Sequence, residues 1–125
     1  MSKNDTYNSG RLAEWLALFY LMSRGYFPVD KNVVTGKGTH AGEVDLIVRK
    51  GKLLVFVEVK KRQNLEKAAY AISERQKQRI IRGAEAFLKK HKKYDAFDIR
   101  FDAILVEFPW HIRHLTNAWI STMLF

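Results

Sequence analysis

Apolar residues recur at helical spacing in two segments of the chain. The pattern in residues 11–24 predicts a helix that is capped by Asn8 or Ser9 and ends at Gly25. We expect its core-facing side to consist of Leu12, Trp15, Leu16, Phe19 and Met22. A second amphipathic helix is predicted over residues 74–91, with a core-facing side of Ile80, Ile81, Ala84, Phe87 and Leu88. Residues 1–7 are polar, and we expect them to form a flexible tail.

Short apolar runs bounded by turn residues predict the strands. They cover residues 27–33, 43–49, 52–60 and 99–108, with a further candidate at 111–115. Lys50-Gly51 is typical of a hairpin turn, and the second helix lies where a crossover to a parallel strand needs it. This order of elements predicts one α/β (α+β) domain over residues 1–125, with a mixed sheet of four to five strands flanked by two main helices.

Charged residues interrupt two of these strands. Asp45 lies within Gly42-Glu43-Val44-Asp45-Leu46-Ile47, and Glu58 and Lys60 lie within Val57-Glu58-Val59-Lys60. Buried charges are usually paired or hold a metal, because an isolated one is costly. If Lys50-Gly51 is the turn, Asp45 opposes Phe56 and lies diagonally from Glu58, on the face that also carries Lys60. A three-residue turn would place these side chains on opposite faces.

Two carboxylates beside a lysine are suited to phosphodiester hydrolysis with Mg²⁺ or Mn²⁺. Asp45 and Glu58 would supply carboxylate oxygens and Val59 a carbonyl oxygen, while Glu14 of the first helix is a further candidate ligand. The metal would activate a water, and Lys60 could orient that water or stabilise the transition state. The alternative for Glu58 and Lys60 is an ordinary ion pair on a strand, and for Glu14 a solvent-facing position on its helix.

The composition favours a polyanionic partner. Among 125 residues, 22 Lys and Arg against 13 Asp and Glu give a net charge of +9, which suits nucleic acid or an anionic membrane surface. There is no cysteine, so disulfides and thiolate metal sites are excluded. With neither a signal-peptide core nor an apolar stretch near the roughly 20 residues needed to cross a bilayer, we expect a cytoplasmic protein without a membrane partner.

Basic residues near the charged strands are candidates for phosphate contacts. Lys60, Lys61 and Arg62 follow one another at the end of the strand that carries Glu58. Arg75 and Arg79 recur at helical spacing in the second helix, where a solvated helix face is the alternative. No sequence-reading module accompanies them, so binding without base specificity is expected.

At these residues the chain resembles the PD-(D/E)xK nuclease superfamily, which has the restriction-endonuclease-like fold. Asp45 and Glu58-Val59-Lys60 match its pattern of an acid, a variable gap and acid-x-Lys on the next strand. More narrowly, the chain is similar to the YraN-type bacterial proteins, which resemble archaeal Holliday-junction resolvases. This resemblance runs from about residue 10 to residue 119 and includes Gly10-Arg11-Leu12-Ala13-Glu14, Arg100-Phe101-Asp102 and Asn117-Ala118-Trp119.

The resemblance implies a Mg²⁺-dependent DNA endonuclease with a role in DNA repair or recombination. Asp45, Glu58 and Lys60 would form its catalytic and metal-binding set, with Glu14 as the acid on the first helix. Gln76 matches a helical glutamine of the active site, although Ile80 stands where the accompanying tyrosine is expected. The resemblance also implies branched or structured DNA as substrate and a homodimer. Two alternatives remain open: a nucleic-acid-binding module with weak or partner-dependent cleavage, and an interaction protein that recruits its partner through strand 27–33.

Overall fold

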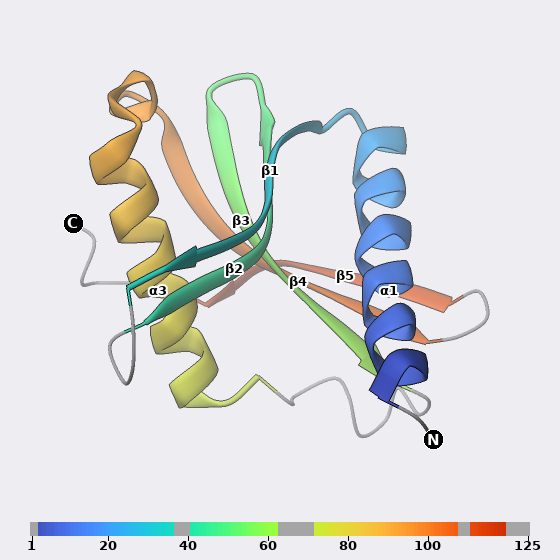
Figure 1. The fold of residues 1–125 in the computed structure, drawn as a ribbon. Helices are drawn as coiled ribbons and strands as arrows, with labels where there is room; N and C mark the ends of the chain where they lie inside the picture. The colour runs from blue at the N-terminus through green and yellow to red at the C-terminus, as the bar shows by residue number, and fades with distance from the viewer. Residues whose placement is uncertain (1–2, 37–40, 63–71, 108–110, 120–125) are drawn as a thin grey trace.

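A five-stranded mixed sheet forms the centre of the molecule, with one long helix on each face (Figure 1). The computed structural model describes residues 3–36, 41–62, 72–107 and 111–119, with the backbone alone for residues 3–10, 62 and 119. In chain order the elements are α1 (Lys3–Ser23), β1 (Phe27–Thr35), β2 (Gly42–Lys50), β3 (Leu53–Arg62), α3 (Glu74–Lys90), the short 3-10 helix η2 (Lys92–Tyr94), β4 (Asp98–Glu107) and β5 (His111–Trp119). The predicted α+β fold is therefore confirmed.

The strands lie side by side in chain order, from β1 at one edge to β5 at the other. Neighbouring strands are antiparallel except β3 and β4, which are parallel, as the intervening helix predicts. Among the described residues, no helix is both long and apolar enough to cross a membrane.

The β2–β3 hairpin has the predicted faces but a different register. Lys50 pairs with Leu53, so the turn is Gly51-Lys52 instead of Lys50-Gly51, and Gly51 adopts a positive φ of 60°. This moves the pairing by two residues. An even shift leaves every side chain on the same face of the sheet, which is why the predicted grouping of Asp45 with Glu58 survives the error.

Helix α1 starts earlier than predicted and packs through a different face. Its backbone is helical from Lys3, so the caps predicted at Asn8 or Ser9 and the predicted tail are wrong for residues 3–7. The predicted end is confirmed, because Gly25 has a positive φ of 94° and its N–H donates to the Met22 carbonyl. The core-facing residues are Ala13, Ala17, Leu18 and Leu21, with Leu16 and Tyr20 partly buried beside them.

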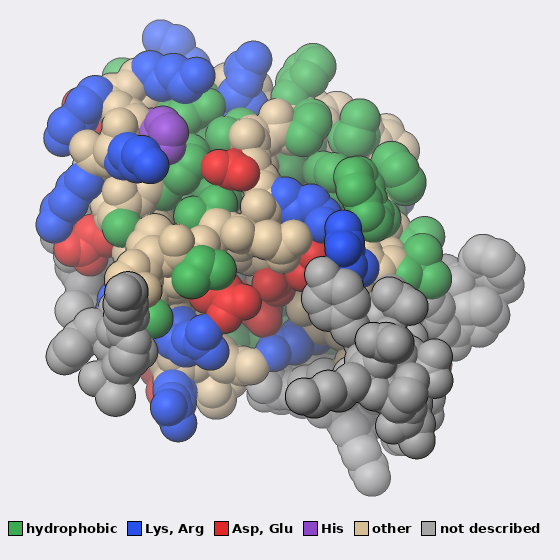
Figure 2. Space-filling model, viewed as in Figure 1, with side chains coloured by type: hydrophobic (Ala, Val, Ile, Leu, Met, Phe, Trp, Pro, Cys, Tyr) green, Lys and Arg blue, Asp and Glu red, His purple; other side chains and the backbone are tan. Residues whose placement is uncertain are grey.

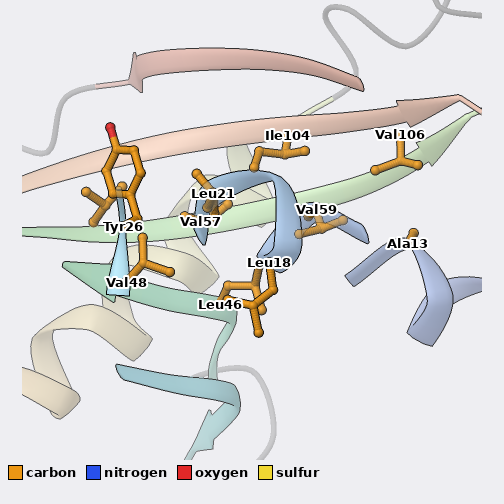
Figure 3. Close-up of a cluster of buried hydrophobic side chains, with 12 residues drawn as sticks. Ala13, Leu18, Leu21, Tyr26, Leu46, Val48, Val57, Val59, Ile104 and Val106 are labelled. Carbon is orange, nitrogen blue, oxygen red and sulfur yellow. The ribbon is translucent and has the colours of Figure 1, made fainter. Parts of the chain in front are cut away.

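The predicted core face of α1 is instead largely exposed. Leu12, Trp15, Phe19 and Met22 all point away from the sheet, and of the predicted set Leu16 alone contributes to the core. Both sides of this helix are apolar, so periodicity alone does not select one. The two alanines settle the choice, because small side chains let the helix backbone approach the sheet closely, as Figure 3 shows for Ala13 beside Val59 and Val106.

Helix α3 covers the other face with the residues that its pattern predicts. Ile80, Ile81, Ala84 and Phe87 are buried against Phe56 and its neighbours, and Leu88 is partly buried. The helix approaches β2 at two glycines: a Cβ added to Gly42 would lie 2.3 Å from the Gly83 nitrogen. This contact fixes the distance between α3 and the strand that carries Asp45.

A buried polar network joins β4 to β5 on the α1 side. The Asp102 carboxylate is fully buried and accepts hydrogen bonds from Nε and Nη2 of Arg100, from the Asn117 N–H, and forms one with Nε2 of His114. Arg100 also donates to the Tyr26 hydroxyl. Burial alone would raise the pKa of Asp102, but the bonds from His114, Arg100 and Asn117 outweigh it and hold that pKa below its ordinary value. Arg100, Asp102 and Asn117, which are part of the family resemblance, therefore form one hydrogen-bonded network.

Candidate active site

A cavity of about 200 Å³ opens between β2, β3 and α3. It is lined by Glu43, Asp45, Glu58, Lys60, Gln76, Arg79 and Ile80. Sequence reasoning had assigned Asp45, Glu58, Lys60 and Gln76 to one site, and the structure brings all four to this cavity. In Figure 2 acidic side chains gather near the middle of the face in view, bordered by Lys and Arg.

The cavity lies where the β2–β3 ladder ends. The last described pair is Leu46 with Val57; one step further, the Val59 N–H donates to Oδ2 of Asp45 at 2.9 Å, where a strand carbonyl would otherwise accept. The N–H and C=O of one strand residue point toward the same neighbouring strand. The Val59 carbonyl therefore faces the same side as Asp45, as the predicted third oxygen ligand requires.

Burial and mutual repulsion perturb the two central carboxylates. Burial, then the negative charge of Glu58, raise the pKa of Asp45 to about 8, against the lowering effect of the Val59 N–H; Glu14 and Glu43 add smaller repulsions. Burial also raises the pKa of Glu58, although Lys60 opposes the shift with its ammonium 3.2 Å from Oε1. Repulsion by Glu43 adds a smaller contribution that also raises the pKa of Glu58. Such shifts in a cavity are typical of functional sites.

Three cations are distributed over four neighbouring carboxylates. Lys31 lies 3.2 Å from Oε1 of Glu14, Lys60 lies 3.2 Å from Oε1 of Glu58, and Arg79 pairs with Glu43. Within the part of the chain that the structure describes, these pairs leave Asp45 without a cation. A divalent cation at Asp45 would remove this imbalance, and hard oxygen donors are the ligands that Mg²⁺ prefers.

The oxygen donors of this site fit Mg²⁺ only in part in their present arrangement. Among the described residues, no three Asp, Glu, His or Cys side chains form a ready set of metal ligands. Asp45, Glu58 and the Val59 carbonyl remain as donors, and Mg²⁺ keeps several waters in such sites. Glu58 would have to exchange its Lys60 partner for the metal.

Glu14 lies at the margin of this site and not in the cavity. Its side chain is largely buried, it contributes to the raised pKa of Asp45, and Lys31 of β1 is its ion-pair partner. Its Oε1 has no aligned hydrogen-bond donor among the described residues, despite that nearby ammonium. This geometry places Glu14 beside the site, outside direct reach of the cavity.

Gln76 serves α3 as well as lining the cavity. Its backbone N–H donates to the Ser73 hydroxyl and its side-chain oxygen accepts the Ser73 N–H, which together form a capping box. The side chain is therefore engaged in holding the start of the helix at the site.

Sequence reasoning missed two residues here. Glu43 was not among the predicted site residues, yet it lines the cavity, and its spacing of two from Asp45 was the available signal. Lys31 could not be predicted, because a lysine on an edge strand carries no recognisable pattern. The positions of both residues beside the site depend on how the strands and α1 pack against one another.

The predicted phosphate-contacting residues are spread around the cavity. Lys60 and Arg79 line it, while Arg75 is exposed at the start of α3. Lys61 is partly buried on β3 just beyond Lys60, and the side chain of Arg62 lies outside the described residues.

Comparison with known proteins identifies the family. A family model described as "Uncharacterised protein family UPF0102" matches residues 13–106, which include every carboxylate of the site. The chain belongs to the UPF0102 family. The predicted likeness to YraN-type bacterial proteins is confirmed at this level.

Relatives within UPF0102 match over most of their own length. The chain is 43% identical over 111 residues to UPF0102 protein amb4503 of Paramagnetospirillum magneticum, covering 88% of this chain and 85% of the relative. It is 40% identical over 113 residues to a UPF0102 protein of Nitrobacter winogradskyi, covering 90% and 92%. A third relative, UPF0102 protein RPA0323 of Rhodopseudomonas palustris, is 39% identical over 122 residues, covering 98% and 91%.

Proposed function

We propose that this UPF0102 protein is a metal-dependent endonuclease that hydrolyses DNA phosphodiester bonds. The observation that carries the proposal is the meeting of Asp45, Glu58 and Lys60 in one cavity. This cavity lies at the end of the β2–β3 ladder, where the Val59 N–H donates to Asp45. The resemblance of these residues to the PD-(D/E)xK pattern supports the same reaction.

Each residue has a distinct part in the proposed reaction. Asp45, Glu58 and the Val59 carbonyl would hold Mg²⁺ or Mn²⁺, which when bound lowers the pKa of a water and neutralises charge on the phosphate. Lys60 keeps an ammonium beside Glu58 and is suited to orient a water or to donate to a phosphate oxygen. Arg79 brings a second cation to the opposite wall, where it is half-exposed and held by Glu43.

The proposed substrate is DNA, because the net charge of +9 favours a polyanion. Lys61, Arg62 and Arg75 would contact phosphates on either side of the cavity. By resemblance alone, we propose branched or structured DNA, a homodimeric active form and a role in repair or recombination.

A second candidate is a nucleic-acid-binding module that cleaves weakly or only with a partner. Two observations favour it. The described carboxylates do not form a ready group of metal ligands, and Glu58 is already in an ion pair with Lys60. Binding without cleavage would follow if this ion pair persisted in the complex.

Cleavage of a labelled DNA panel separates the two candidates. Duplex, single strand, flap, fork and four-way junction would be incubated with Mg²⁺, Mn²⁺ or EDTA. We compare the wild type with Glu58→Gln, and use Glu85→Gln as the matched control, because Glu85 lies on α3 outside the cavity.

The endonuclease proposal expects metal-dependent cleavage that Glu58→Gln abolishes and Glu85→Gln retains. Lys60→Ala should also abolish cleavage while leaving DNA binding largely intact, and Lys89→Ala is its control. Binding without cleavage of any substrate would favour the second candidate. Cleavage that survives Glu58→Gln would place the active site elsewhere.

A further inference from the structure

Helix α1 has a second apolar face that the described part of the chain leaves largely exposed. Its inner face packs on the sheet through Ala13, Ala17, Leu18 and Leu21. Its outer face carries four large apolar side chains at helical spacing: Leu12, Trp15, Phe19 and Met22. In Figure 2 hydrophobic side chains gather on the same side of the molecule as α1. A contiguous apolar surface of this kind is typical of a binding surface.

Two aromatic rings form the centre of this face. Trp15 and Phe19 are 42% and 58% exposed, and their rings stack with centroids 5.8 Å apart at 30°. Both residues therefore expose a large part of their side chains to solvent, one helical turn apart. Exposed aromatic rings suit a planar partner better than an irregular aliphatic one.

Lys31 connects the aromatic pair to the candidate active site. Its ammonium lies 4.9 Å from the centroid of the Trp15 ring and 3.2 Å from Oε1 of Glu14. Glu14 in turn contributes to the raised pKa of Asp45. One cation thus touches both the aromatic surface and the acid at the margin of the cavity.

Cations accompany the other aromatic residues near α1 as well. Arg24 lies over the ring of Tyr20 at 4.9 Å, and Arg49 lies over the ring of Phe27 at 5.5 Å. Alternating aromatic rings and cations suit a chain that alternates bases and phosphates. A second copy of this protein would bring the same cations and a charge of +9 to the same surface, so charge complementarity favours a polyanion over self-association here.

The geometry points to Trp15 and Phe19 as a stacking platform for an unpaired nucleobase of the nucleic acid that occupies the cavity. This inference rests on the proposed function for the identity of the substrate, and it adds a preference for nucleic acids with unpaired bases. Lys31 would contact the phosphate of the stacked nucleotide, and the strand would continue past Glu14 into the cavity.

Equilibrium binding without metal tests the platform separately from cleavage. In EDTA we measure the affinity for labelled single-stranded oligo-dT and for a relaxed, covalently closed circular duplex, which has neither ends nor loops. Trp15→Ala should weaken binding to the single strand by about tenfold and binding to the closed duplex by less than about twofold. Trp15→Phe keeps a ring and should restore most of the affinity, while Met22→Ala is the matched control on the same face without a ring. Urea unfolding checks that each variant folds.

Tryptophan fluorescence gives an independent readout. Stacking should quench the emission of Trp15, so oligo-dT should quench the wild type and Glu58→Ala equally, and Trp15→Phe much less. If the panel shows no cleavage but this quenching occurs, the endonuclease proposal fails and the platform stands. If cleavage occurs while Trp15→Ala leaves single-strand binding unchanged, the platform is wrong.

Two other occupants of this face would also overturn the inference. If light scattering shows that Trp15→Ala converts a dimer into a monomer, a second copy covers the face. If vesicles containing phosphatidylglycerol quench Trp15 and oligo-dT does not, the face binds an anionic lipid surface.

Discussion

Asp45→Asn should stabilise the metal-free protein at neutral and basic pH while it abolishes metal binding. Asp45 is the carboxylate of the site that the described ion pairs leave without a cation, and it lies beside Glu58 in a largely buried position. Asparagine has nearly the same shape and keeps an oxygen that can accept the Val59 N–H. The substitution therefore removes the titrating group and changes little else.

The magnitude follows from the pKa of Asp45. Burial, then repulsion by Glu58, raise it from an ordinary 3.8 to about 8. Each pKa unit corresponds to about 1.4 kcal/mol, so the part of the shift that lies between the ordinary pKa and pH 7 would amount to roughly 4 kcal/mol. Because the cavity is open to water and the charge keeps part of its hydration, we expect a stabilisation of about 1–3 kcal/mol.

The pH dependence has a definite sign. The unfolded chain loses the Asp45 proton near pH 4, whereas the folded protein keeps it until the pH approaches 8. The folded state therefore binds more protons in this window, and the free energy of unfolding falls as the pH rises through it. The amide that Asp45→Asn introduces cannot titrate, so the variant should lose this part of the slope.

Urea unfolding in EDTA at pH 5 and pH 8 measures the effect. The advantage of Asp45→Asn should be larger at pH 8, and Asp98→Asn, at an exposed position, should show none. Added Mg²⁺ should stabilise the wild type and not Asp45→Asn, because only a folded state that binds the ion gains from it. If Asp45→Asn destabilises the protein equally at both pH values, the account of a costly buried charge is refuted.

Three further substitutions test the framework around the site. Gly42→Ala should cost about 3 kcal/mol and abolish cleavage, because its Cβ would meet the backbone of Gly83 and push α3 from β2; thermal unfolding and the cleavage assay measure both. Asp102→Asn should cost about 3 kcal/mol in urea at pH 7, and its effect should shrink in acid as the wild-type carboxylate takes up a proton at its lowered pKa. Ser73→Ala should cost about 1 kcal/mol of unfolding free energy through loss of the helix cap, and should lower cleavage by loosening Gln76.

Much of the fold follows from local pattern. The second helix, the pairing of β2 with β3 and the parallel β3–β4 pair could be predicted because apolar periodicity and connection length each allow few solutions. The face shared by Asp45, Glu58 and Lys60 survived an error in the turn, because side-chain direction depends only on whether a register shift is odd or even.

The parts that could not be predicted depend on long-range packing. The outer and inner faces of α1 are both apolar, and the choice between them is made by how closely Ala13 and Ala17 let the helix approach the sheet. Lys31 gains its position from β1 passing beside α1, which no local pattern encodes. The capping role of Gln76 depends on Ser73 three residues before it, a spacing typical of a capping box.

The hydrogen bond from the Val59 N–H to Asp45 turns one backbone amide into a reporter of the cavity. Most strand amides bond to carbonyls whose charge never changes, whereas this one bonds to a group that titrates. In a ¹⁵N-labelled sample, the Val59 resonance should therefore move with the ionisation of Asp45 and again when an ion or a phosphate enters. A single amide at the end of the β2–β3 ladder would then report both the ionisation of Asp45 and the binding of a ligand, without an added probe.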